Sequence, residues 1–283
     1  MFRTILVPTD LSANADAAVR YAVRFGDAVG AAKILFFYAN GRYLPTSTPQ
    51  RLLHELEAGM VQEDTQKLHA HIQQVLVADG LEYNPHRISL LVRNGSYFEA
   101  IEEVLSEQKP DLVVMGTKGA SGLRKYVLGS NTVKTLNLTT GHVLAVPGGY
   151  QYPSGQRILY ATDLQHLEPE ARQVAALARA LHAALSVFHF YRPEQPEKRA
   201  DERQLTQTLG EIIPDQPFSL LLKSLTNGED IGTIMQATAE EQQTSLLVMF
   251  ARGRGWLERL ITTNHTAEVF YGSQVPVLAF RSA

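Results

Sequence analysis

The chain has 283 residues, a formal net charge of −3, a hydrophobic fraction of 45% and no cysteine. This length is enough for two domains of ordinary size, and the hydrophobic fraction supports a full core. The charge gives no reason to expect nucleic acid or an anionic membrane as a partner. The absence of cysteine excludes disulfides, thiolate catalysis and cysteine-ligated metals, and the nine histidines show no spacing that predicts a metal site.

No apolar run approaches the roughly 20 residues that a membrane-spanning helix needs. Residues 1–8 enter a predicted strand without the layout of a signal peptide. We therefore expect a soluble, cytoplasmic protein that binds neither membrane nor nucleic acid.

The first half of the chain alternates short apolar runs with helical patterns. In chain order, the apolar runs predict strands at residues 3–7, 32–39, 87–93, 111–115 and 142–146. Between them, helical periodicity predicts helices over residues 12–29, 50–78 and 97–107 and a further helix that starts near residue 132, with Ser12 as the N-cap of the first helix. Strands that alternate with helices indicate an α/β fold with a parallel sheet and helices on both faces.

The pattern of the first half starts again after a stretch rich in Gly, Pro and Ser at residues 148–156, which we interpret as a linker. Residues 5–11 (ILVPTDL) return as residues 158–164 (ILYATDL), and residues 142–146 are matched with residues 275–279. A repeat of this length is far longer than a solenoid unit and means two copies of one domain. We predict an N-terminal domain over 1–147 and a C-terminal domain over 157–283.

A glycine-bearing loop follows the fourth predicted strand. Gly116, Gly119, Gly129 and Ser130 give the spacing Gly-x2-Gly-x9-Gly-Ser between this strand and the next predicted helix. Glycine lets the backbone approach a ligand closely, and the first turn of a helix offers unpaired N–H groups to a phosphate. The spacing is neither that of a Walker loop nor that of the Rossmann fingerprint.

This motif resembles the nucleotide-binding motif of the universal stress protein (UspA) family, and the repeat makes the chain similar to a tandem, two-domain member. The resemblance implies a Rossmann-like, five-stranded parallel sheet flanked by helices in each domain. It also implies that the two domains form an internal pseudo-dimer through their last strands, and it leaves open whether two chains form a homodimer.

The resemblance further implies an adenine nucleotide, ATP, ADP or AMP, in the N-terminal domain, with Mg²⁺ as a companion of ATP. An aspartate that ends the first strand lies near adenine and ribose in the family, the end of the second strand offers backbone groups to adenine, and the motif surrounds ribose and phosphates. The matching residues are Pro8, Thr9, Asp10, Tyr38, Ala39, Gly116, Gly119, Gly129, Ser130, Asn131 and Thr132. The alternatives are a helix cap at Asp10 and simple turn glycines at Gly116 and Gly119.

The second copy departs from the motif. Phe250 replaces the first glycine and Thr262 the third, and a side chain at either position hinders close approach of the backbone to a ligand. We therefore expect the C-terminal domain to bind ATP weakly or not at all.

Three functions are compatible with these patterns. The first is a stress-response regulatory protein that binds adenine nucleotide and changes its contact with an unknown protein partner. The second is a slow Mg²⁺-dependent ATPase or phosphotransfer enzyme, for which Asp10 is the only nearby carboxylate we can name. The third is an interaction scaffold that has lost its ligand, which the intact motif of the first copy argues against.

Overall fold

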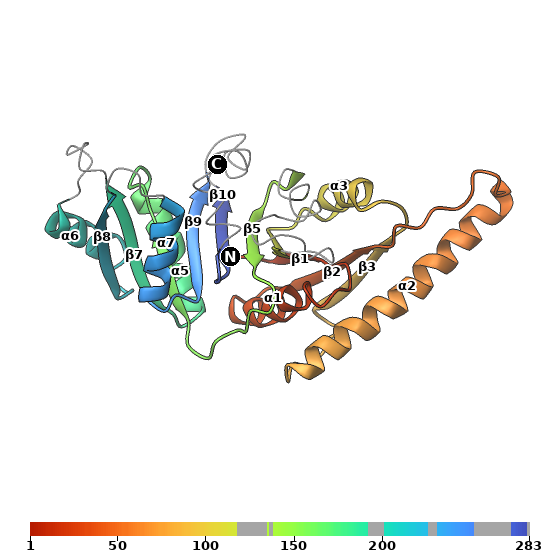
Figure 1. Cartoon of the computed structure of the whole chain (residues 1–283), viewed down its shortest axis with the longest axis horizontal. Coiled ribbons are helices and arrows are strands. Elements are labelled where there is room, and N and C mark those ends of the chain that lie inside the picture. Colours follow the sequence, from red (N-terminus) through yellow and green to blue (C-terminus); the bar gives the residue numbers. More distant parts are fainter. Residues whose placement is uncertain (118–134, 136–137, 192–200, 226–230, 252–272, 282–283) are drawn as a thin grey trace. The chain divides into compact units, whose positions relative to one another are not determined.

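The computed structural model describes the chain except for residues 118–134, 136–137, 192–200, 226–230, 252–272 and 282–283. The chain divides into two compact units, Met1–Gln151 and Tyr152–Ala283 (Figure 1).

The first unit is an α/β unit built on a parallel sheet. Its described strands are β1 Thr4–Pro8, β2 Lys33–Ala39, β3 Ile88–Arg93, β4 Leu112–Gly116 and β5 His142–Val146, and its described helices are α1 Asp16–Ala28, α2 Gln50–Ala78 and α3 Tyr97–Gln108. The sheet order is β3-β2-β1-β4-β5, with every pair parallel. The central strands are buried along most of their length because helices cover both faces, with α1 and α3 on opposite sides (Figure 1).

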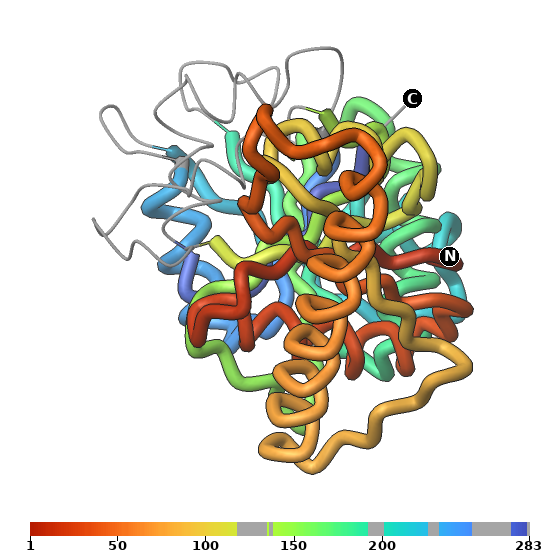
Figure 2. Tube along the Cα trace, turned by 90° about the vertical axis from the view of Figure 1, so that its right-hand side faces the viewer, coloured from red at the N-terminus to blue at the C-terminus, as the bar shows by residue number. Residues whose placement is uncertain are grey.

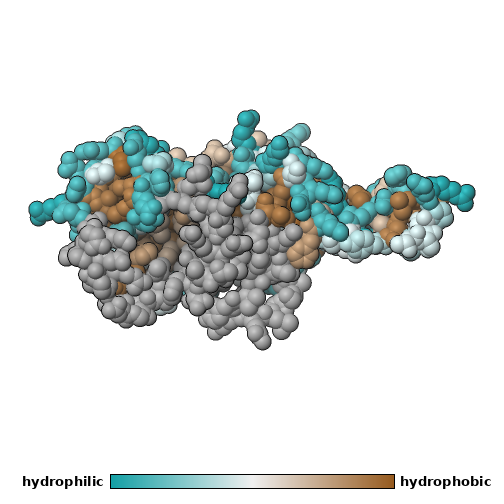
Figure 3. All heavy atoms as spheres, turned by 90° about the horizontal axis from the view of Figure 1, so that it is seen from above, coloured by the Kyte–Doolittle hydropathy of each residue, from teal (hydrophilic) through white to brown (hydrophobic). Residues whose placement is uncertain are grey.

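Helix α2 has two halves with different surroundings. Its second half packs on the unit through Leu68, Ile72 and Leu76, which are fully buried. In its first half, Leu52 and Leu56 are 39% and 45% exposed. Figure 2 shows α2 as the long orange helix in front, and Figure 3 shows hydrophobic side chains among hydrophilic ones at the right-hand end, where α2 begins.

The second unit repeats the same order of elements. Its described strands are β6 Arg157–Ala161, β7 Ala184–Tyr191, β8 Phe218–Ser224, β9 Leu246–Ala251 and β10 Val277–Arg281, and its described helices are α5 Leu167–Ala180, α6 Glu202–Ile212 and α7 Ile231–Glu241. Its strands are ordered β8-β7-β6-β9-β10, again all parallel. The predicted α/β class and the two tandem copies are thus confirmed.

The predicted strands of the first unit agree with the structure to within one residue, but two details of the prediction are wrong. Helix α1 starts at Asp16 rather than near Ser12, with Ala15 at its N-cap and no side-chain cap. The match of residues 142–146 with 275–279 is displaced by one residue. Val143 pairs with Val113 of β4, and its counterpart Val277 pairs with Leu247 of β9.

Candidate functional site

The turn after β1 is held by its own side chains. The backbone N–H of Leu11 donates to Thr9 Oγ1 at 3.1 Å, and that of Ser12 donates to Asp10 Oδ1 at 3.1 Å. Ser12 Oγ also donates to Asp10 Oδ1 at 2.5 Å. Leu11 has a φ of 58°, which turns the chain sharply and leaves Asp10 exposed at the edge of the sheet.

This turn explains why the predicted cap of α1 is wrong. The Ser12 hydroxyl bonds to Asp10 rather than to a backbone N–H of the helix, and the chain makes a further turn before helical geometry starts at Asp16. The side chain of Asp10 is likewise engaged with the turn and does not cap α1.

Gly116 is the last residue of β4 and pairs with Val146 of β5. The next residue, Thr117, is buried and donates its backbone N–H to the Val146 carbonyl at 3.0 Å. Beyond this point the motif residues Gly119, Gly129, Ser130, Asn131 and Thr132 lie outside the described residues. The structure therefore locates the start of the glycine loop but not its remainder.

The carboxyl ends of β1 and β4 form the switch point of the sheet. From β1 the chain proceeds to β2 and β3 on one side, and it then returns to β4 and β5 on the other. In open α/β sheets ligands bind in the crevice outside the carboxyl ends of the strands at such a point. Asp10 follows one of the two strands and Gly116 ends the other, so these two predicted residues flank the crevice.

Tyr38 and Ala39 end β2, which is the neighbour of β1. Tyr38 is half-buried, and burial raises the pKa of its phenol, with a further contribution from Asp64 and a smaller one from Asp10. Pro8, Thr9, Asp10, Tyr38, Ala39 and Gly116 therefore lie at the ends of three adjacent strands.

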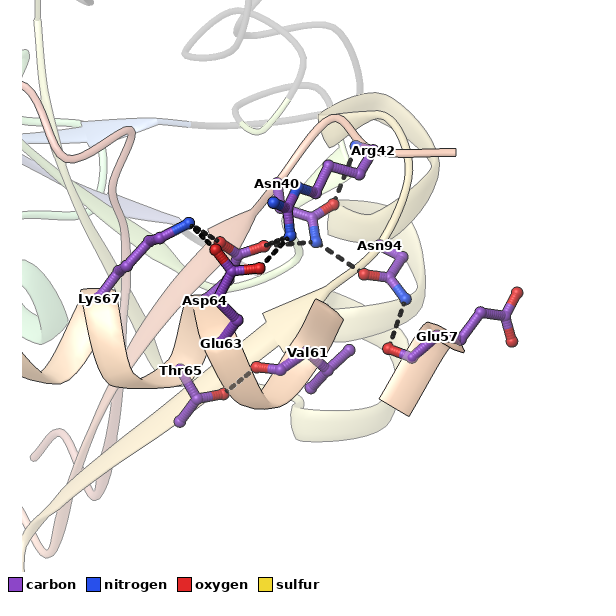
Figure 4. A network of polar contacts seen from close by, with 9 residues as sticks. All are labelled: Asn40, Arg42, Glu57, Val61, Glu63, Asp64, Thr65, Lys67 and Asn94. Atoms are coloured by element: carbon purple, nitrogen blue, oxygen red, sulfur yellow. Dashed lines mark hydrogen bonds and ion pairs between the residues drawn. The ribbon is translucent and has the colours of Figure 1, made fainter. Parts of the chain in front are cut away.

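A polar network that the sequence did not predict adjoins the end of β2 (Figure 4). Asn40 donates through Nδ2 to Asp64 at 2.9 Å and to Asn94 at 2.6 Å. Asp64 is 3% exposed, and it also accepts from Lys67 at 3.1 Å and from Arg42 at 3.3 Å. The available signal was an Asn directly after each of two predicted strands, at positions 40 and 94.

A second contact that the sequence did not predict joins α3 to the chain beyond the glycine loop. The hydroxyl groups of Tyr97 and Thr135 lie 2.6 Å apart, and Thr135 is fully buried. Burial raises the pKa of Tyr97, and the nearby Asp10 carboxylate adds to this shift. Tyr97 thus connects α3 with Thr135, three residues after the last motif residue.

The second unit keeps the turn but not the glycine at the end of the neighbouring strand. The backbone N–H of Leu164 donates to Thr162 Oγ1 at 3.0 Å, that of Gln165 donates to Asp163 Oδ1 at 3.0 Å, and Leu164 has a φ of 66°. At the position of Gly116, however, stands Phe250.

The ring of Phe250 lies 5.8 Å from that of Tyr160 in an edge contact and 5.0 Å from that of Phe280 in a stacked one, between centroids. At the position of Gly116 the second unit therefore carries an aromatic side chain that contacts two others. Thr262, the other predicted replacement, lies outside the described residues.

The described residues also bear on two other kinds of site. No group of three or more His, Asp or Glu side chains in this part of the chain could hold a metal ion. None of the helices found there combines the length and the apolar character needed to cross a bilayer.

Comparisons with known proteins agree with this architecture. The family model described as "Universal stress protein family" matches residues 1–147 and 223–281. A universal stress protein from Archaeoglobus fulgidus DSM 4304 is similar over 99% of both chains, with 20% identity and a TM-score of 0.69. A putative universal stress protein from Pseudomonas aeruginosa UCBPP-PA14 is similar over 99% of this chain and 93% of its own, with 15% identity and a TM-score of 0.59.

At these identities the solved structures support the fold alone, and a comparison with curated proteins finds no match. The family model covers more than half of the chain, in segments from both units. The chain therefore belongs to the universal stress protein family.

Proposed function

We propose that the first unit binds an adenine nucleotide at the carboxyl edge of its sheet, and that the protein acts as a nucleotide-responsive regulator. The observation that carries this proposal is that Asp10 and Gly116 flank the switch point of the sheet. Gly116 also opens the spacing Gly-x2-Gly-x9-Gly-Ser, so geometry and motif favour the same crevice.

In this proposal each strand end contributes a different part of the site. The Asp10 carboxylate, at the surface, accepts hydrogen bonds from hydroxyl or amino groups of the nucleoside. Gly116 has no side chain, so the backbone approaches the sugar closely. By sequence alone, Gly119, Gly129, Ser130, Asn131 and Thr132 surround the phosphates with N–H and hydroxyl donors.

The second unit has a different role in this proposal. Phe250 stands at the position of Gly116 and contacts Tyr160 and Phe280, so we expect little or no nucleotide there. The stoichiometry is accordingly one nucleotide per chain.

Titration calorimetry with ATP, ADP and AMP, with and without Mg²⁺, tests the proposal on the full chain. The decisive variant is Gly116→Phe, which gives the first unit the residue that the second unit carries at the equivalent position, Phe250. We expect it to abolish binding while the far-UV circular dichroism spectrum is kept.

A matched control is Gly59→Phe, since a side chain at Gly59 meets nothing within 4 Å and the residue lies in the first half of α2. Mass spectrometry of nucleotide released from the purified protein gives an independent check. Equal affinity of the Gly116→Phe variant and the wild type would place the ligand elsewhere.

A further inference from the structure

The second unit contains a pocket at the amino edge of its sheet. Its walls come from the second half of α7, from the start of β9 and from residues 273–275, which precede β10. The pocket has a volume of about 110 Å³. It lies at the other end of the strands from the crevice in which open α/β sheets bind their ligands.

The inside of this pocket is apolar. Met235, Ala239 and Leu247 line it and are 3%, 6% and 1% exposed, and Val275 adds a half-buried side chain. An apolar cavity of about 150 Å³ stays dry and binds benzene. A pocket of this size and lining therefore suits a single aromatic ring or a branched alkyl group, whose removal from water favours binding.

Hydrogen bonds within the protein hold the wall of the pocket in place. Ser273 Oγ donates to Val275 O at 2.7 Å and accepts from Val275 N at 3.2 Å. The backbone N–H of Leu247 donates to Pro276 O at 2.9 Å, which joins the start of β9 to the chain before β10. The pocket is therefore preformed, and a ligand loses little affinity to the ordering of its wall.

The mouth of the pocket is polar and carries a negative charge. Glu240, Gln243 and Gln274 line it with exposed residues. Among the described residues that line the pocket, Glu240 is the one charged residue. Its carboxylate attracts an ammonium group at the mouth and repels a carboxylate there. Because an exposed ion pair contributes little, the apolar body of a ligand supplies most of the affinity.

The first unit has a different surface at the equivalent place. Val113 and Leu247 occupy equivalent strand positions, and Leu105 and Ala239 stand eight residues before them. A residue with positive φ lies four positions before each of the two strand residues, which supports this alignment. The hollow of the first unit is wider, about 600 Å³, and charged side chains of both signs line it. An apolar pocket therefore distinguishes the second unit.

We propose that the second unit binds a small organic amine in this pocket, with an aromatic or branched aliphatic body against Met235, Ala239 and Leu247 and an ammonium group near Glu240. The proposal does not depend on nucleotide binding, because the pocket and the carboxyl edge of the sheet lie at opposite ends of the strands. It assigns a ligand to the unit in which Phe250 replaces the first glycine of the motif.

Ligand-observed NMR on the full chain tests the pocket with three probes that share one ring: benzylamine, benzyl alcohol and benzoate. We expect benzylamine to bind, benzyl alcohol to bind about two- to fivefold more weakly, as the loss of one exposed ion pair implies, and benzoate to bind most weakly.

The decisive variant is Ala239→Leu, which fills the pocket with the side chain that the first unit carries at this position, Leu105. It should weaken benzylamine binding about tenfold or more. Ala237→Leu is the matched control, because Ala237 is an exposed residue of α7 outside the pocket, and it should keep the affinity of the wild type.

The ammonium group is tested with a second pair of variants. Glu240→Gln should remove the preference for benzylamine over benzyl alcohol, and it changes only an exposed side chain, so it serves even if Ala239→Leu does not fold. Glu241→Gln removes a charge that pairs with Lys223 outside the pocket and should keep the preference.

A folded Ala239→Leu variant that binds benzylamine as tightly as the wild type would overturn the proposal, and so would a wild type that binds none of the three probes. Equal affinities of the wild type for benzylamine and benzyl alcohol would overturn the assignment of an amine.

Discussion

Replacing Tyr160 by Phe removes a single oxygen atom, yet it should destabilise the second unit strongly. Tyr160 is fully buried in β6, and its hydroxyl donates to Glu170 Oε2 of α5 at 2.7 Å. Glu170 is 3% exposed. Burial raises the pKa of the Tyr160 phenol, so the hydroxyl remains a donor across the usual pH range.

The size of the expected destabilisation follows from the hydrogen-bond partner of Tyr160, the carboxylate of Glu170. A hydrogen bond to a charged group contributes about 1.5–3 kcal/mol, and its loss leaves the carboxylate less well solvated in the core. Because the Phe ring keeps the packing, almost no cavity term is added, and we expect about 2 kcal/mol of destabilisation for Tyr160→Phe. In a double-mutant cycle with Glu170→Gln, the coupling energy should be about 1–2 kcal/mol.

The assay is urea unfolding followed by far-UV circular dichroism, with Tyr83→Phe as the control. Tyr83 is half-buried and lies in the first unit, so its variant should stay within about 0.5 kcal/mol of the wild type. A Tyr160→Phe variant as stable as the Tyr83→Phe variant, or a coupling energy near zero, would show that the buried pair contributes nothing.

Three further outcomes are expected. Lys67 donates to Glu63 and lowers the pKa of that carboxyl to about 2. The lowered pKa stabilises the fold at pH values above the unfolded pKa of about 4.3, and this contribution is lost as the pH falls from about 4.3 through the folded pKa. Urea titrations at neutral and at low pH should therefore show a stability difference between wild type and Glu63→Gln that vanishes at low pH. Tyr97→Phe loses the hydroxyl contact with Thr135 at 2.6 Å and should cost about 1 kcal/mol in thermal unfolding. Ser96 Oγ accepts from a backbone N–H in the first turn of α3, so Ser96→Ala should cost about 1 kcal/mol and speed hydrogen exchange there.

The strands of the first unit could be predicted because their signal is local. Runs such as residues 112–115 are apolar throughout, and a strand buried on both faces requires just that pattern. The start of α1 could not be predicted in the same way. Ser12 is a good capping residue by type, but its hydroxyl is held by Asp10 in a turn whose geometry depends on the φ of Leu11.

The network around Asn40 could not be predicted because its members are distant in sequence. Asp64 follows Asn40 by 24 residues and Asn94 follows it by 54. A carboxylate on a long charged helix normally indicates a solvent-facing position, and nothing local distinguishes Asp64 from Glu63. Only the fold, which brings Asn40 against α2, buries one of these carboxylates and leaves its neighbour exposed.

The residues kept in both units can be distinguished from those that differ, and the two sets indicate what the fold requires and what a ligand requires. The turn after the first strand is kept in both, down to the bonds that Thr9 and Thr162 accept from Leu11 and Leu164. The ends of the neighbouring strands differ: Gly116 corresponds to Phe250. A turn that served only a ligand would have no reason to persist in a unit where Phe250 replaces the glycine of the motif. The turn therefore belongs to the fold, and the residues that differ between the units are those whose exchange should move or remove binding.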